Sequence, residues 1–205
     1  MLDVLTLRHN IPLYVSYSLN EMVRYSHRRV DVRQVLEKQH FLDAFTESRR
    51  LSIEHPSFLR SLGWFRKGLN VEDPIDRFLA LWNAIESVAA RYYRLAPGVD
   101  IERAERGCKN QIWACFLGLW GPVDDWPYIA SDSTWIDQNY EVRNAIAHRY
   151  LTIEYSDVAD VIESQEQLEN LSQRFLADSQ SAIISRSDPD QGETNIPSDA
   201  SSTLF

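Results

Sequence analysis

The chain has 205 residues, 44% of them hydrophobic and 11% aromatic, so it can build one substantial core and is not disordered as a whole. Only 7 residues are glycine, which disfavours sandwiches and barrels, whose many tight turns use glycine heavily. The formal net charge of -9 argues against a protein held on nucleic acid by bulk charge, although a small local phosphate site stays compatible with it.

Residues 1–50 give two competing patterns. The segments LDVLTL and IPLYVSYS alternate enough to predict strands, with a hairpin across RHN, and a helix is also compatible with about Val30 to Ser48. We expect these residues to form an N-terminal extension packed on the rest of the chain. The start has no basic segment followed by a signal-peptide apolar run, and nowhere do about eighteen apolar residues follow one another. The sequence therefore predicts a soluble, cytoplasmic protein without a membrane span.

Residues 51–185 carry a helical pattern, because apolar side chains recur there at three- and four-residue steps. One helix begins at Pro56, and a second opens at Asp73, an N-cap followed by Pro74, and runs to about Arg94. The others are expected over about 100–119, over about 133–150, and after a cap at Ser156. Helices of this length with short links predict an all-α fold, an antiparallel bundle of four or five helices.

The last segment, residues 186–205, is polar, acidic and rich in Pro, Gly and Ser. Such a composition buries too little apolar surface to order itself, so we expect a disordered acidic tail.

One stretch of the fourth predicted helix combines residues with useful chemistry. Arg143, Asn144, His148 and Tyr150 form the pattern R-N-x-x-x-H-x-Y. At 100° per residue Arg143 lies in the middle of the apolar arc of this helix, while Asn144 and His148 lie on a polar strip beside it. A permanent cation at the centre of a core-facing arc is costly unless it is paired.

Two interpretations of this stretch are open from the residues alone. In the first, Arg143 is a structural core arginine paired with Glu86 of the second helix, and His148 is an ordinary surface histidine. In the second, the imidazole of His148 is a general acid or base, Arg143 stabilises charge on a phosphate, and Asn144 orients the substrate or the imidazole. This set suits metal-independent RNA cleavage, with two copies meeting at a dimer interface because one histidine cannot readily be both base and acid.

The same residues resemble the HEPN superfamily, whose members carry an R-x4–6-H motif late in an all-α bundle. Arg143, Asn144 and His148 match that motif. The segment WFRKGLNVEDPIDRFLALWNAIESVAARYYR is similar to the second-helix region of the Apea-like HEPN branch, with Trp82 and Glu86 at its Trp and Glu positions. The segment RNAIAHRYLTIEYSDVADVIES resembles the toxin branch encoded beside minimal nucleotidyltransferases, whose R-x4-H-x-Y motif places Tyr150 at the tyrosine position.

The resemblance covers about residues 56–180 and implies a homodimeric, metal-independent endoribonuclease in defence, stress response or toxin–antitoxin systems. In the toxin branch it further implies that a nucleotidyltransferase antitoxin silences the enzyme by adenylylating the tyrosine, here Tyr150. The family also includes non-catalytic modules that dimerise or bind a partner or a nucleotide, and that alternative keeps the pairing of Arg143 with Glu86 purely structural.

Weaker signals complete the set of candidates. A basic cluster of Arg24, Arg28, Arg29 and Arg33 is either a solvated surface or a track for RNA. There is no Gly-rich phosphate loop, and Cys108 and Cys115 belong to no C-x-x-C pattern, so neither a cofactor nor a metal site is expected.

Overall fold

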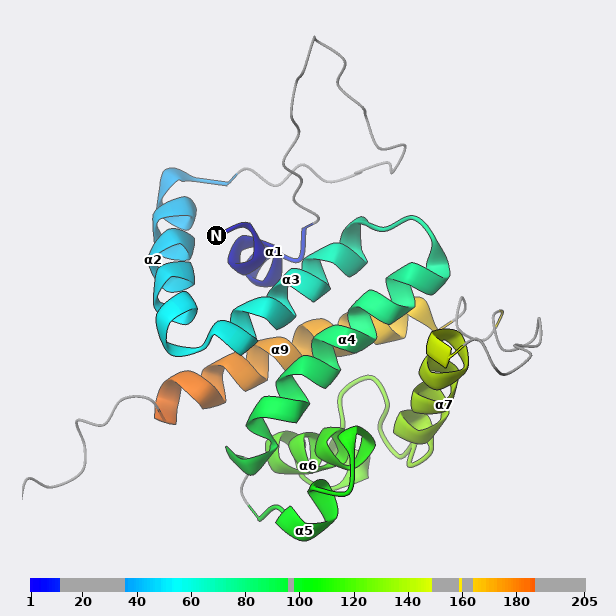
Figure 1. Cartoon of the computed structure of the whole chain (residues 1–205). Coiled ribbons are helices and arrows are strands. Elements are labelled where there is room, and N and C mark those ends of the chain that lie inside the picture. The colour runs from blue at the N-terminus through cyan, green and yellow to red at the C-terminus, as the bar shows by residue number, and fades with distance from the viewer. Residues whose placement is uncertain (12–35, 96–97, 149–158, 160–163, 187–205) are drawn as a thin grey trace, which may run out of the picture.

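The computed structural model describes residues 1–11, 36–95, 98–148, 159 and 164–186. This part of the chain contains eight α-helices, two short 3₁₀ helices and no strand, so the predicted all-α fold is confirmed (Figure 1). The helices are α1 Leu2–His9, α2 Lys38–Glu54, α3 Pro56–Asn70, α4 Pro74–Tyr92, α5 Ile101–Ala104, α6 Cys108–Trp120, α7 Trp135–His148 and α9 Gln165–Arg186. None of these helices is long and apolar enough to span a membrane.

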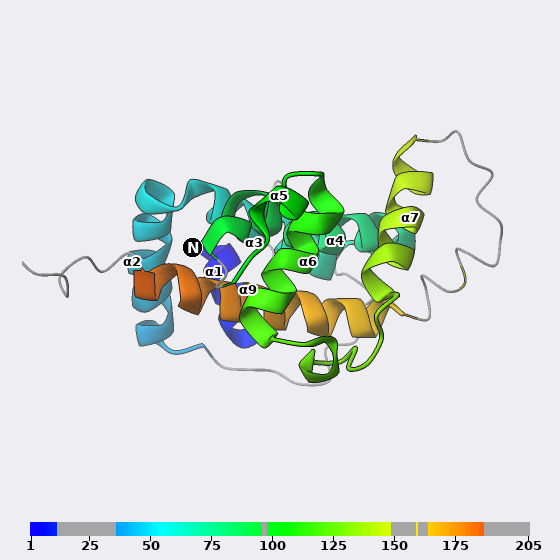
Figure 2. The ribbon, with the colours of Figure 1, turned by 90° about the horizontal axis from the view of Figure 1, so that it is seen from below.

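Helix α4 is the central element of the bundle. It packs against α3, α9, α6 and α7, and its inward face is buried from Phe78 to Ala89. Figure 2, seen from below, shows α2 and α7 at opposite ends of the molecule, with α6 and α9 between them. Helix α1 lies among α2, α3 and α9. The bundle therefore has an α1–α2–α3 end and an α6–α7 end, joined by α4 and α9.

The start of α4 follows the sequence prediction closely. Asp73 is the N-cap, and its Oδ1 accepts hydrogen bonds of 2.9 Å from the backbone N–H groups of Ile75 and Asp76. Pro74 occupies the first helical position, where the missing N–H costs nothing. The predicted start of this helix is confirmed, and its regular part ends at Tyr92, followed by a 3₁₀ turn over Tyr93–Leu95.

Aromatic rings connect α4 to the α6–α7 end of the core. Trp82 lies 5.7 Å from the ring of Trp135 at the start of α7, and the ring of Phe116 on α6 lies 6.5 Å from Trp135 and 5.1 Å from Phe175 on α9. Trp135 is only 4% exposed, as expected for a core residue. These contacts anchor the first turn of α7 to the rest of the bundle.

The predicted first strand is wrong. Residues 2–7, predicted as a strand, belong to helix α1, in which Val4, Leu5, Thr6 and Leu7 are all buried. A short segment buried on every side has no readable period, so alternation in the sequence cannot separate helix from strand there. Helix α2 also runs past the expected limit at residue 50, and α1 shares one core with the bundle. The predicted second strand and the basic cluster fall mostly or wholly in residues 12–35, outside the described residues.

The third predicted helix is interrupted. Helix α5 ends at Ala104 and α6 begins at Cys108, because Gly107 adopts a φ of 151°, which no helix accommodates. Helix α9 begins at Gln165, and the expected cap at Ser156 lies outside the described residues, as do residues 187–205 of the predicted tail.

Gly68 allows the close contact between α3 and α4, and replacing it should destabilise the fold. A Cβ atom there would lie 2.7 Å from the side chain of Leu81 and 3.3 Å from its backbone nitrogen. We expect Gly68→Ala to lower the free energy of unfolding by about 1–3 kcal/mol, measured by urea denaturation. Gly63→Ala is the matched control, because a Cβ at Gly63 meets nothing within 4 Å and alanine is the better helix former. Equal stability of the two variants would contradict this role of Gly68.

Candidate functional site

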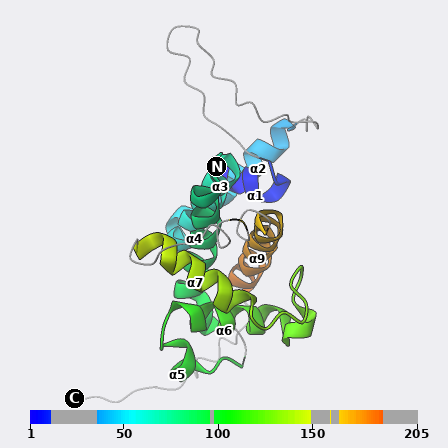
Figure 3. The ribbon, with the colours of Figure 1, turned by 90° about the vertical axis from the view of Figure 1, so that its right-hand side faces the viewer.

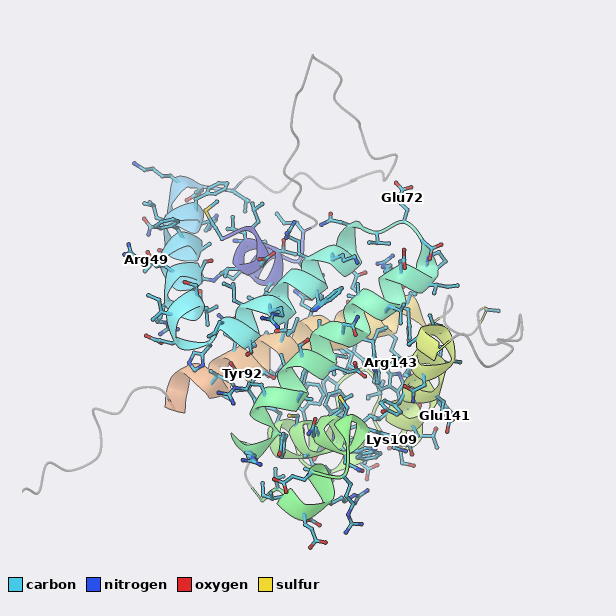
Figure 4. All side chains as sticks on the ribbon, viewed as in Figure 1. Arg49, Glu72, Tyr92, Lys109, Glu141 and Arg143 are labelled. Atoms are coloured by element: carbon cyan, nitrogen blue, oxygen red, sulfur yellow. The ribbon has the colours of Figure 1, made fainter. Side chains whose placement is uncertain are left out.

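Helix α7 carries Arg143 near its C-terminal end, with the side chain directed toward α4 (Figure 4). Figure 3 shows α7 facing the viewer, against α4 and α6. The arginine side chain is 27% exposed, so its guanidinium lies at the edge of the core and is accessible from solvent. The buried residues Trp135 and Ile136 in the first turn of α7 anchor this helix to the core, whereas residues 142–146 are only half-buried.

Glu86 of α4 holds the guanidinium. Its Oε2 lies 3.1 Å from an Arg143 nitrogen, and its Oε1 accepts a 3.0 Å hydrogen bond from the indole N–H of Trp82. The Glu86 side chain is only 12% exposed. Because Trp82 packs against Trp135 of α7, both carboxylate oxygens are fixed by residues of the α4–α7 contact. The glutamate therefore fixes the direction of the guanidinium as well as compensating its charge.

Arg143 keeps unused hydrogen-bonding capacity. A second guanidinium nitrogen donates to Oδ1 of the neighbouring Asn144 at 3.2 Å. A guanidinium has five N–H donors, and the described residues provide partners for two of them. The remaining donors, on a partly exposed and oriented cation, suit the oxygens of a phosphate.

A second ion pair ties α7 to α6. Lys109 Nζ, labelled in Figure 4, lies 3.0 Å from Oδ1 of Asp137, one turn before Glu141. Sequence patterns do not single out this pair, since Lys109 and Asp137 are far apart in the chain. Together with Trp135 it fixes the N-terminal half of α7, so the helix is held at both Asp137 and Arg143.

Cys108, at the first position of α6, lies close to the ion pair. Burial, together with the nearby Glu86 carboxylate, raises the pKa of its thiol to about 12, while the charge of Arg143 acts in the opposite direction. Burial also raises the pKa of the Cys115 thiol to about 12. Both thiols are therefore protonated at neutral pH and are poor nucleophiles.

The structure thus brings together three of the predicted site residues, Arg143, Asn144 and Glu86. His148 is the last residue of α7, and the position of its side chain is outside the description, so its geometry relative to Arg143 stays a prediction. Tyr150 and the basic cluster of Arg24, Arg28, Arg29 and Arg33 also lie outside the described residues. Trp82 matched the resemblance, but its hydrogen bond to Glu86 was not predicted, although the i, i+4 spacing would have allowed it.

No group of three or more His, Cys, Asp or Glu side chains within the described ranges could hold a metal ion. Comparison of the chain with family models, with curated proteins and with solved structures finds no match.

Proposed function

We propose that this chain is a metal-independent endoribonuclease of the HEPN type, acting as a homodimer with a composite R-x4-H site. The observation that supports this most strongly is the state of Arg143, which is oriented by Glu86, partly exposed, and left with free donors by the described residues. His148, five residues later on the same helix, supplies the titratable group, and Asn144 orients the substrate or the imidazole.

The reaction uses the ribose itself as the nucleophile. His148 of one copy removes the proton of the 2′-OH, the 2′-oxygen attacks the adjacent phosphorus, and the 5′-oxygen leaves with a proton from the second copy's imidazole. Arg143 stabilises the additional negative charge on the phosphorane. The products are a 2′,3′-cyclic phosphate and a free 5′-hydroxyl, so no water or metal enters this step.

The direct test is incubation of the purified chain with single-stranded RNA in excess EDTA. We expect cleavage that EDTA does not inhibit, with 2′,3′-cyclic phosphate ends identified by mass spectrometry, and a dimer by sedimentation equilibrium. Products that carry 5′-phosphates, or cleavage that requires added Mg²⁺, would contradict the proposal.

The toxin-type resemblance adds a regulatory proposal for Tyr150, which lies two residues after His148. In this proposal a nucleotidyltransferase antitoxin transfers AMP from ATP to the phenolic oxygen, with release of pyrophosphate and of the phenolic proton, and the attached AMP blocks the adjacent site. Co-expression with such a partner should add one AMP to the chain, and Tyr150→Phe should prevent it.

The second candidate is a non-catalytic module that dimerises or binds a partner or a nucleotide. One observation favours it: the charge of Arg143 is already compensated by Glu86, which is what a structural ion pair requires. The two candidates make opposite predictions for substitutions of Arg143.

A further inference from the structure

A hollow at the α1–α2–α3 end of the molecule belongs to no function assigned so far. It has a volume of about 500 Å³, which lies within the usual range for small-molecule sites. Asp3 of α1 and Ser52 of α2 form part of its lining, and α3 contributes Leu59, Arg60 and Trp64. Figure 1 shows this end of the bundle on the opposite side from α7.

The side of α3 that faces the hollow combines aromatic and basic side chains. Arg60, Gly63, Trp64 and Lys67 follow one another at steps of three, one and three residues, which places them on one face of the helix. Arg60 is exposed and has no ion-pair partner among the described residues. Lys67 Nζ lies 5.0 Å from the centre of the Trp64 ring, so a second cation is close to the aromatic surface.

The hollow is locally positive although the chain is acidic. Among the described residues that line it, the only acid is Asp3, and its carboxylate already accepts a hydrogen bond from Arg66. Arg60, which lines the hollow, and Lys67, which follows Trp64 on α3, have no carboxylate partner among the described residues. This local balance favours an anionic ligand.

Gly63 keeps the hollow open at the middle of α3. Glycine is less favourable than alanine within a helix, and the close approach of Leu81 explains its presence at position 68. Gly63 has no such neighbour, since a Cβ atom there would meet nothing within 4 Å. Gly63 is one of the residues that line the hollow. The space beside Gly63 is therefore open, and a side chain larger than alanine at this position would extend into the hollow.

We propose that this hollow binds one nucleotide unit, with the base stacked on Trp64 and the phosphate between Arg60 and Lys67. Proteins bind single-stranded nucleic acid without sequence preference by stacking bases on aromatic rings along a positively charged groove, and Trp64 is a half-buried ring with cations on both sides along α3. The same chemistry is offered by a free mononucleotide, so the experiment separates these two sources. The site does not depend on the reaction proposed for α7, because binding here involves none of its residues.

The test uses the full chain carrying His148→Ala, so that RNA binding is measured without cleavage. Fluorescence anisotropy of a labelled single-stranded RNA and calorimetric titration with AMP give the two affinities. We expect Gly63→Leu, which fills the hollow, to weaken binding at least tenfold with no loss of melting temperature, and Gly63→Ala to have little effect. Trp64→Ala should weaken binding as strongly as Gly63→Leu.

Arg60→Gln should weaken RNA binding several-fold and reduce the salt dependence of the affinity. The control is Arg106→Gln, which removes an exposed cation far from the hollow and should leave the affinity unchanged. Loss of AMP binding alone in the Gly63→Leu variant would identify a free nucleotide as the ligand. The proposal is overturned if Gly63→Leu binds both ligands like the parent, if the parent binds neither, or if Arg106→Gln weakens binding as much as Arg60→Gln. RNA cleavage by a chain that fails this test would leave the proposed nuclease intact.

Discussion

Replacing His148 by alanine should lower the rate of metal-independent RNA cleavage at least about a hundredfold, because a positioned general acid or base contributes about 10²–10⁴ to such a step. The fold should persist, since His148 is the last residue of α7 and alanine is a good helix former. The measurement is a single-turnover cleavage rate at saturating protein, combined with the melting temperature. His148→Gln, which keeps hydrogen bonding but cannot titrate, should be as inactive as the alanine variant.

Glu141→Ala is the matched control for this prediction. Glu141 is an exposed residue of the same helix and points away from the ion pair in Figure 4. Its replacement should leave the cleavage rate within about twofold, because surface substitutions without buried contacts have small effects. If the His148→Ala protein cleaves RNA like its parent, the activity comes from another site or from a contaminant, and the proposed role of α7 is wrong.

The parts of the fold that were predictable from the sequence are those set by local signals. Asp73 and Pro74 specify the start of α4 through their own backbone and side-chain chemistry, and Pro56 does the same for α3. The conformation of Gly107, which divides α5 from α6, has no such local signature, because a glycine inside an apolar helical pattern is often tolerated. The helical state of α1 depends on burial by α2, α3 and α9, which only the folded chain provides.

The candidate site shows the same division. The pairing of Arg143 with Glu86 could be anticipated, because a cation on the apolar face of one helix needs an acid on the facing helix, and the structure contains that ion pair. Two other features could not be anticipated: the ion pair between Lys109 and Asp137, and the hollow beside Trp64. Each consists of residues that are far apart in the chain and are brought together by tertiary packing. Periodicity places a residue on a helix face but gives no information about which helix lies opposite.

The ion pair by itself does not separate catalysis from structure. A carboxylate that holds an arginine both stabilises the fold and fixes the direction in which the free N–H donors point. Glu86 has one oxygen for Arg143 and one for Trp82, so its position is fixed independently of any ligand. In such an arrangement the guanidinium can bind a phosphate without first changing its own orientation. The same ion pair would also serve as a purely structural link between α4 and α7. Only the effect of removing the guanidinium distinguishes the two roles.

Arg143→Ala should abolish cleavage while the chain stays folded. Removal of one preorganised donor to a developing negative charge costs about 10²–10³ in rate. The lost pair leaves the mostly buried Glu86 carboxylate with only its hydrogen bond from Trp82, so the free energy of unfolding should fall by about 1–3 kcal/mol. Arg143→Lys should restore most of this stability, but less than a tenth of the rate, because an ammonium cannot bind Glu86 and a phosphate with the same fork.

Glu86→Gln separates positioning from charge, because the amide oxygen still accepts from Trp82 while the amide nitrogen cannot accept from Arg143. We expect a drop of about tenfold in the cleavage rate, with the RNA affinity nearly unchanged, since the cation remains but is no longer held in place. The measurement is the rate at saturating RNA per folded molecule, with the folded fraction determined by circular dichroism. A cleavage rate that follows the folded fraction in all three variants would assign Arg143 and Glu86 to the architecture alone and contradict their proposed part in the reaction.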